Sequence, residues 1–240
     1  KDERVKCVRK ARAIFGAGEE IASDDLKQYF QREALPELAF TPDAEYGVCN
    51  REKGILHVEL SAPADGSRLE SLHGGTVRNA VAASARAEAR CTAEECEALE
   101  ALSKKMDGKF SFQGSGGVLT AECAGRAAHA MEPQKGRNAA ARLVRLFSSC
   151  FGGEALGALW SFVDQKIGLE LDGSSLGLRR EDAVSGPLTV NLGLAEQDNG
   201  VCRAVLDIRY PVTADGEEIF ERLRAAAGAY GVKARVLAEQ

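Results

Sequence analysis

The alternation of hydrophobic and polar residues along the chain predicts several β-strands. Residues 55–61 (ILHVELS) place leucine and valine on one side and place His57 and Glu59 on the other. Successive side chains of a strand point to opposite faces of a sheet. We therefore expect this strand to bury its leucines and to leave His57 on a solvated face beside Glu59.

The C-terminal third of the chain predicts a hairpin followed by a helix and a strand. Two alternating segments, residues 187–196 and 201–212, are separated by a turn that contains Asn199 and Gly200. Asn-Gly is a strong signal for a tight turn between antiparallel strands. Residues 215–230 begin with a capping aspartate and predict a helix, and residues 232–239 predict a final strand.

Periods of three to four residues predict further helices, and short apolar runs predict further strands. A Thr92/Glu95 capping box opens one of the helices. The expected helices are Ser23–Glu33, Thr92–Met106, Gly136–Phe151 and Glu154–Ile167, and the other expected strands are Val8–Phe15, Leu38–Val48, 67–72, 85–91 and Gly116–Gly125. From Ile55 onward this order predicts an α+β fold, with helices packed on a mixed or antiparallel sheet.

Composition narrows the classes of function. The 240 residues are 45% hydrophobic and 28% charged, with a net charge of −5 that is spread along the chain. These values favour a globular protein and give no support for a nucleic-acid or membrane partner. No apolar segment approaches a membrane span of about 20 residues, and no signal peptide is indicated. The seven scattered cysteines, without a CxxC pair, argue against disulfides and favour a reducing, cytoplasmic location.

Five motifs stand in a characteristic order along the chain. They are GAGEE (16–20), AFTPDAEYGV (39–48), GGTVRNAV (74–81), GRAAHAMEPQKGRNAA (125–140) and LDIRYPVTADGEEI (206–219). Together they resemble the di-zinc metallopeptidases that include aminoacylases, carboxypeptidases and dipeptidases, and most of all the PepV-like dipeptidase branch. The resemblance implies hydrolysis of small peptides by a water molecule that two zinc ions activate.

The resemblance also assigns roles to three acidic residues near the N-terminus. It implies that Glu19 is the general base, and that Glu20 and Asp43 are zinc ligands. The residue types suit this chemistry, because carboxylates bind zinc and can take a proton from metal-bound water. Taken alone, Glu19 and Glu20 fit equally well as solvated turn residues, and Asp43 fits an ordinary Pro-Asp turn.

Three further residues match positions that contact the substrate in the resembling enzymes. His129 corresponds to a lid histidine that donates to the substrate carbonyl oxygen, where negative charge develops. Asn79 and Arg209 correspond to residues that bind the C-terminal carboxylate of the substrate, a role that suits the planar guanidinium. The residues alone also allow a packed or solvated His129 and a surface ion pair of Arg209. The usual proline after Asn79 is missing.

The chain resembles only about half of such an enzyme. Residues 1–53 resemble the end of a first catalytic segment with α/β character, and residues 54–240 resemble a two-layer lid domain with ferredoxin-like elements. The His-x-Asp motif, the bridging aspartate and the late histidine of the family are missing. Two hypotheses follow: the chain is an inactive piece of a zinc dipeptidase whose catalytic domain it must join, or it is a non-catalytic binding module that associates through a sheet edge.

Overall fold

The computed structural model describes residues 10–17, 24–41 and 50–239, and the chain divides into two units, Lys1–Val48 and Cys49–Gln240. In the first unit, helix α1 (Asp24–Phe30) confirms the helix expected there. The strands expected at Val8–Phe15 and Leu38–Val48 are wrong over their described parts, which are not in strands. A strand needs a neighbour for its backbone hydrogen bonds, and the described part of this unit offers none. The rest of both segments lies outside the described residues.

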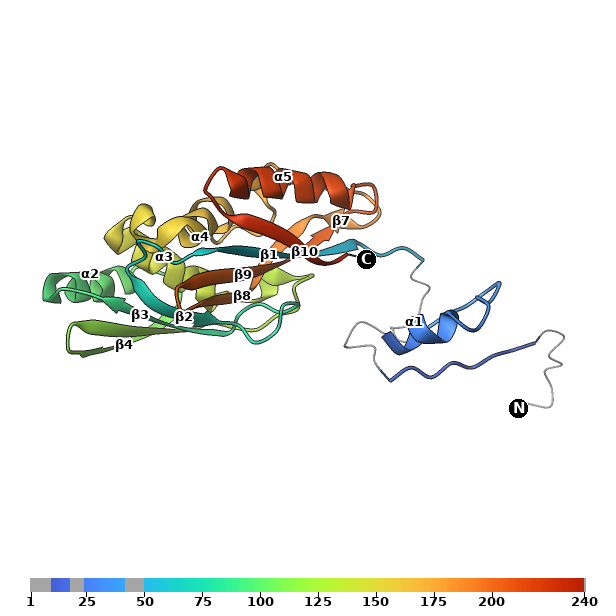
Figure 1. Ribbon diagram of the computed structural model, residues 1–240, viewed down its shortest axis with the longest axis horizontal. Coiled ribbons are helices and arrows are strands. Elements are labelled where there is room, and N and C mark those ends of the chain that lie inside the picture. The colour runs from blue at the N-terminus through green and yellow to red at the C-terminus, as the bar shows by residue number, and fades with distance from the viewer. Residues whose placement is uncertain (1–9, 18–23, 42–49, 240) are drawn as a thin grey trace. The chain divides into compact units, whose positions relative to one another are not determined.

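The second unit is built on one antiparallel sheet of eight strands (Figure 1), in the order β10-β1-β9-β8-β2-β3-β5-β4. The strands are β1 (Gly54–Pro63), β2 (Leu69–Gly74), β3 (Ser84–Arg90), β4 (Lys109–Ser115), β5 (Val118–Ala124), β8 (Thr189–Asp198), β9 (Val201–Tyr210) and β10 (Lys233–Glu239), with a separate short pair, β6 (Glu181–Asp182) and β7 (Gly186–Pro187). The α+β fold with an antiparallel sheet is thus confirmed for this unit. The role of residues 54–240 as a lid stays a prediction, and so does the role of residues 1–53 as a catalytic segment.

The helices cover one face of this sheet (Figure 1). They are α2 (Ala93–Ser103), α3 (Ala139–Phe151), α4 (Gly157–Phe162) and α5 (Gly216–Gly228), with the short 3₁₀-helices η2 (Pro133–Lys135), η3 (Gly153–Leu156) and η5 (Ser174–Leu176) and the π-helix η4 (Val163–Ile167). Helix α3 packs on β3 and β5, while α4 and α5 pack on β1. Alternate residues of the strands, such as Leu56, Val58 and Leu60, are fully buried beneath them.

Local sequence explains most of the element boundaries. Thr92 and Glu95 form the expected capping box of α2, and Asp215 caps α5 through its carboxylate. Asn199 and Gly200 both adopt positive φ angles, 50° and 78°, as a tight hairpin between right-twisted strands requires. The helix and hairpin expected for residues 187–239 are therefore confirmed.

Two expectations about the elements need correction. The strand expected at Gly116–Gly125 begins only at Val118, because Gly116 and Gly117 have φ angles of 61° and 82° and form the turn from β4. The alternating strand β4 itself was not expected. The single helix expected at Glu154–Ile167 is instead η3, α4 and η4, broken at Gly157, whose φ angle is 79°.

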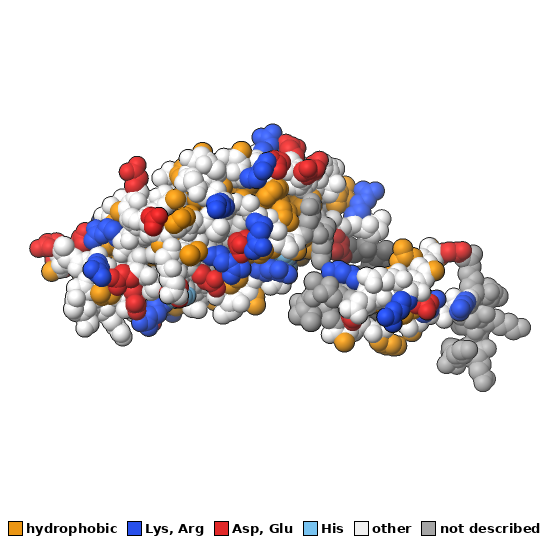
Figure 2. Space-filling view, in the orientation of Figure 1, with side chains coloured by type: hydrophobic (Ala, Val, Ile, Leu, Met, Phe, Trp, Pro, Cys, Tyr) orange, Lys and Arg blue, Asp and Glu red, His pale blue; other side chains and the backbone are white. Residues whose placement is uncertain are grey.

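Charges of both signs are interspersed on the face of the second unit that Figure 2 shows. On the sheet face opposite the helices, Glu59 lies between two arginines, at 2.5 Å from Arg203 Nε and 2.7 Å from Arg235 Nη2. Two buried thiols, Cys123 and Cys202, pack in the core, and burial raises the pKa of each to about 11. Within the described residues, no helix is both long and apolar enough to cross a membrane.

Candidate functional site

The acidic residues expected to do the metal chemistry lie outside the described residues. Glu19 and Glu20 belong to the gap at 18–23, and Asp43 belongs to the gap at 42–49. In the part of the chain that the structure describes, no three His, Cys, Asp or Glu side chains gather in a group that could hold a metal ion. The described residues by themselves therefore do not fit a zinc centre.

The structure brings Asn79 and His129 together, although they are 50 residues apart. The two segments that carry them form an antiparallel bridge between Ala80 and His129. The Ala130 N–H donates to the carbonyl oxygen of Asn79 at 3.0 Å. Both side chains are exposed, so both are available to a ligand.

The ring of His129 is held by its own loop. Its Nδ1 accepts a hydrogen bond from the Met131 N–H at 3.1 Å. In a neutral imidazole, a nitrogen that accepts leaves the proton on the other nitrogen. The bond therefore favours the tautomer with the proton on Nε2, which makes the exposed side of His129 a hydrogen-bond donor.

Two buried polar side chains of β8 fix this pair of segments to the sheet. Asn191, which is 2% exposed, donates from Nδ2 to the Ala80 carbonyl oxygen at 2.9 Å. Thr189 donates from its hydroxyl to the Ala130 carbonyl oxygen at 3.4 Å. A buried polar group is costly unless it is paired, so these bonds specify where the segments lie on β8.

A close approach of backbones also fixes the loop before Asn79. The loop contacts β8 at Gly193, where the register of the β8–β9 pairing shifts between Leu192 and Leu194. A Cβ atom built on Gly193 would collide with the carbonyl oxygen of Arg78, and one built on Gly75 would collide with that of Gly193. Only glycine at both positions permits this contact.

Arg209 lies on β9 and takes part in a buried charged group with Asp207 and His57. Its Nε and Nη2 atoms donate to the two carboxylate oxygens of Asp207 at 2.7 and 2.9 Å. His57 Nε2 lies 2.9 Å from Asp207 Oδ2. Asp207 is fully buried, whereas the Arg209 side chain is 11% exposed. The bidentate ion pair with buried Asp207 therefore fixes the orientation of the Arg209 guanidinium.

The electrostatics of this group favour an ionised Asp207. Burial alone raises the pKa of its carboxyl group, but the hydrogen bonds from His57 and Arg209 outweigh this effect and hold the pKa below its ordinary value. A guanidinium carries five N–H donors, and among the described residues the Arg209 Nη1 group has no hydrogen-bond partner. Donors are therefore left for an incoming anion.

Strand register relates Arg209 to the other two expected residues. Arg209 pairs with Thr189 across β8 and β9, and Thr189 is the residue that holds Ala130, next to His129. The motifs of the sequence did not single out Asp207, Thr189 or Asn191. The available signal was polar residues two apart within apolar strands, which places them on one face.

The expectation for His57 was wrong in part. It shares a sheet face with Glu59, since both lie at alternate positions of β1, but it is only 8% exposed and so is not solvated. The reason is its pairing with buried Asp207. The Nδ1 atom of His57 is buried and has no hydrogen-bond partner among the described residues.

Comparison with known proteins gives a consistent set of names. No family model matches the chain. The Bacillus subtilis (strain 168) protein named "Putative dipeptidase YtjP" is 29% identical to this chain over 236 residues, which are 95% of this chain and 51% of that protein. The Beta-Ala-Xaa dipeptidase of Lactobacillus delbrueckii subsp. lactis is 25% identical over 235 residues, which are 93% of this chain and 49% of that protein.

A solved dipeptidase structure overlaps this chain only weakly. The aminoacylhistidine dipeptidase from Vibrio alginolyticus overlaps 78% of this chain and 44% of its own at a TM-score of 0.29 and 10% identity, too low to establish a shared fold. The sequence comparisons show that this chain is similar to proteins named as dipeptidases. The chain spans about half the length of the curated relatives it matches.

Proposed function

We propose that this chain is part of a metal-dependent dipeptidase related to the PepV-like branch of the di-zinc metallopeptidases, in which residues 54–240 form the lid. The observation that carries the proposal is the sequence similarity to proteins named dipeptidases, which extends over 95% of the chain. It does not favour the alternative of a non-catalytic binding module. In this proposal the substrate is a small peptide, the location is the cytoplasm, and the isolated chain is inactive.

His129 is proposed to stabilise the oxyanion that forms as water adds to the scissile carbonyl. Its Nδ1 already accepts a hydrogen bond from the Met131 N–H, which leaves Nε2 as the nitrogen that can donate. A donor that is already oriented needs no reorganisation when charge develops on the carbonyl oxygen. The contacts of the adjacent Ala130 with Asn79 and Thr189 hold the segment that carries this ring.

Arg209 and Asn79 are proposed to bind the C-terminal carboxylate of the peptide. Asp207 is then a positioning residue, because it engages one edge of the guanidinium and leaves Nη1 for the substrate. Charge-assisted bonds of this kind are stronger than neutral ones. They are present in both the ground state and the transition state, so they contribute mainly to binding.

The metal part of the proposal rests on the sequence resemblance alone. Glu20 and Asp43 are proposed as zinc ligands, together with residues of the parent enzyme outside this chain, and Glu19 as the general base. Two zinc ions in the parent would supply an activated water.

Kinetics of the full-length enzyme test the proposed roles. His129→Ala should lower kcat by about 10²–10³-fold, the usual loss of one oxyanion donor, with metal content unchanged. Arg209→Ala should raise KM by at least about tenfold, since one charge-assisted bond contributes roughly that factor.

Matched substitutions at exposed sites serve as controls. His73→Ala on β2 and Arg222→Ala on α5 remove the same side chains elsewhere and should leave kcat and KM unchanged. An unchanged kcat in His129→Ala, or a loss of zinc in that variant, would contradict the role assigned to His129.

A further inference from the structure

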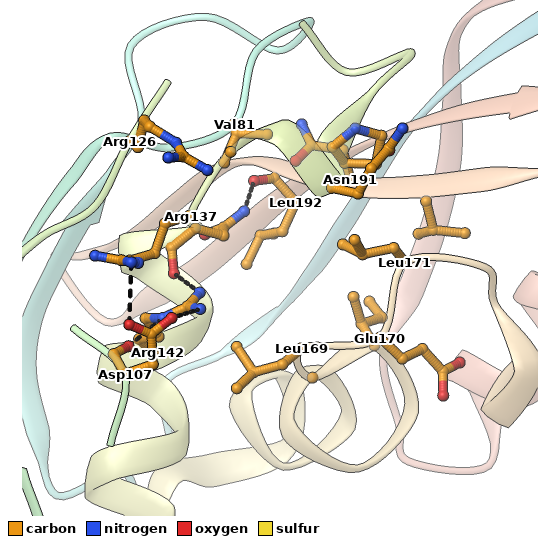
Figure 3. A pocket seen from close by; sticks show the side chains of 17 residues that line it. Val81, Asp107, Arg126, Arg137, Arg142, Leu169, Glu170, Leu171, Asn191 and Leu192 are labelled. Carbon is orange, nitrogen blue, oxygen red and sulfur yellow. Dashed lines mark hydrogen bonds and ion pairs between the residues drawn. The ribbon is translucent and has the colours of Figure 1, made fainter. Parts of the chain in front are cut away.

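A cavity of about 350 Å³ lies at the N-terminal end of α3 (Figure 3), and Asn191, which also holds the Asn79 loop at Ala80, forms part of its wall. Part of its wall is apolar and comes from Val81, Leu171 and Leu192. Asn138, the N-cap of α3, also lines it, whereas neither His129 nor Arg209 does. The cavity is thus large enough for a small molecule and combines an apolar wall with a polar side.

The polar side of the cavity carries three arginines, Arg126, Arg137 and Arg142, which lie together on one side in Figure 3. Among the described residues, Asp107 is the one carboxylate that pairs with any of them. It lies 3.1 Å from Arg137 Nη2 and 3.2 Å from Arg142 Nη2. Among the described residues, two of the three guanidinium groups, those of Arg137 and Arg142, therefore share a single carboxylate.

The three arginines differ in how firmly they are held. Arg142 is 14% exposed and donates from Nε and Nη1 to the carbonyl oxygens of Asp107 and Asn138. Arg126 is exposed and donates from Nε to the Lys135 carbonyl oxygen at 2.7 Å. Within the described part of the chain, no carboxylate lies within ion-pair distance of Arg126.

The other acidic residue of the cavity does not offset this charge. Both carboxylate oxygens of Glu170 accept hydrogen bonds from Ser175, at 2.6 and 2.8 Å, and Figure 3 shows this side chain pointing away from the arginines. The first turn of α3 contains no acidic residue, so the positive end of its dipole adds to the field of the arginines.

We propose that this cavity binds the anionic group of a small molecule, a carboxylate or a phosphate, with Arg126 and Arg137 as donors and the apolar part of the ligand against Val81, Leu171 and Leu192. Guanidinium groups bind both oxyanions through paired N–H donors. The Asp107 side chain is 66% exposed, and an ion pair that exposed is weak, so a ligand can replace it at Arg137. This proposal does not rest on the proposed peptidase function.

Calorimetric titration of the 240-residue chain at constant ionic strength tests the site. Inorganic phosphate and butyrate are titrated separately, and the anion that binds more tightly identifies the preferred oxyanion. Arg126→Gln should weaken binding by about tenfold, the factor expected for one charge-assisted hydrogen bond. Asp107→Asn should strengthen it severalfold, because the competing carboxylate is removed.

The matched control is Arg222→Gln, which removes an exposed arginine of α5 that pairs with Glu218; it should leave binding unchanged. Opposite effects of Arg126→Gln and Asp107→Asn support the site, whichever anion binds. Absence of saturable binding of both anions up to about 50 mM, or equal binding by the Arg126→Gln variant and the unsubstituted chain, would overturn it. Kinetics of the parent enzyme play no part in this result, so it can fail without affecting the proposed peptidase function.

Discussion

At the scale of single residues, the charge on Asp207 is the most consequential feature of the second unit. Asp207 is fully buried and is kept ionised by Arg209 and His57. Such a carboxylate stabilises the fold only while its partners are present, because a buried charge without partners is strongly unfavourable. The same pair that orients Arg209 thus also contributes to stability.

We expect Asp207→Asn to lower the free energy of unfolding by about 3 kcal/mol, because it leaves Arg209 largely buried without its counter-charge. Denaturant titration of the 240-residue chain measures this change. The control Asp65→Asn replaces an exposed aspartate and should change stability by less than about 0.5 kcal/mol. Equal stability of the two variants would show that the buried pair contributes nothing.

The pH dependence has a definite sign. The pKa of Asp207 is lower in the folded chain than its ordinary value of 3.8, so its contribution is fully present above about pH 4. It is lost as the pH falls through the lower, folded-state pKa. When the denaturant titration is repeated at several pH values, the free energy of unfolding of the Asp207→Asn variant should fall less below pH 4 than that of the unsubstituted chain.

At the scale of elements, the position of the Asn79 loop depends on a close contact between backbones as well as on a buried side chain of β8. Gly193 on β8 leaves room for the Arg78 carbonyl oxygen. Asn191 on the same strand donates a hydrogen bond to the carbonyl oxygen of Ala80, two residues further along the loop. Strand β8 therefore sets both how closely the loop approaches the sheet and where along the strand it lies.

Gly193→Ala should displace this loop and lower the free energy of unfolding by about 1–3 kcal/mol, the usual cost of overpacking. Hydrogen exchange should accelerate at the amides of Val81 and Ala130, whose bonds join the two segments. Gly114→Ala on β4 is the control, since its added Cβ meets only a side-chain atom at 4.0 Å. Unchanged exchange in the Gly193 variant would mean that the loop is held elsewhere.

At the scale of the whole molecule, the described part of this chain supplies the groups proposed to bind and orient a substrate but no cluster of metal-binding side chains. The proposed reaction needs both. We therefore expect the purified 240-residue chain to be folded and to show no zinc-dependent hydrolysis of dipeptides. The full-length parent should hydrolyse them under the same conditions. Dipeptide hydrolysis that copurifies with the 240-residue chain would contradict this expectation.

Much of the fold of the second unit follows from local sequence. Alternation in residues 55–61, the Asn199-Gly200 turn and the Asp215 cap each predicted an element correctly, because each depends on neighbours within a few residues. Strand β4 and the interruption at Gly157 were missed. The paired glycines Gly116 and Gly117 and the glycine at 157 adopt positive φ angles, which a run of apolar residues does not reveal.

The sequence by itself determined which residues are candidates, because it singled out His129, Asn79 and Arg209 through their motifs. Only the tertiary structure placed Asn79 beside the His129 segment and put Asp207 under Arg209. It also buried His57, which the alternation of β1 had suggested was solvated. Periodicity assigns the His57 side chain to a face of the sheet. Its partner on that face, Asp207, comes from β9, which is more than 100 residues away in the chain, so long-range strand pairing decides its surroundings.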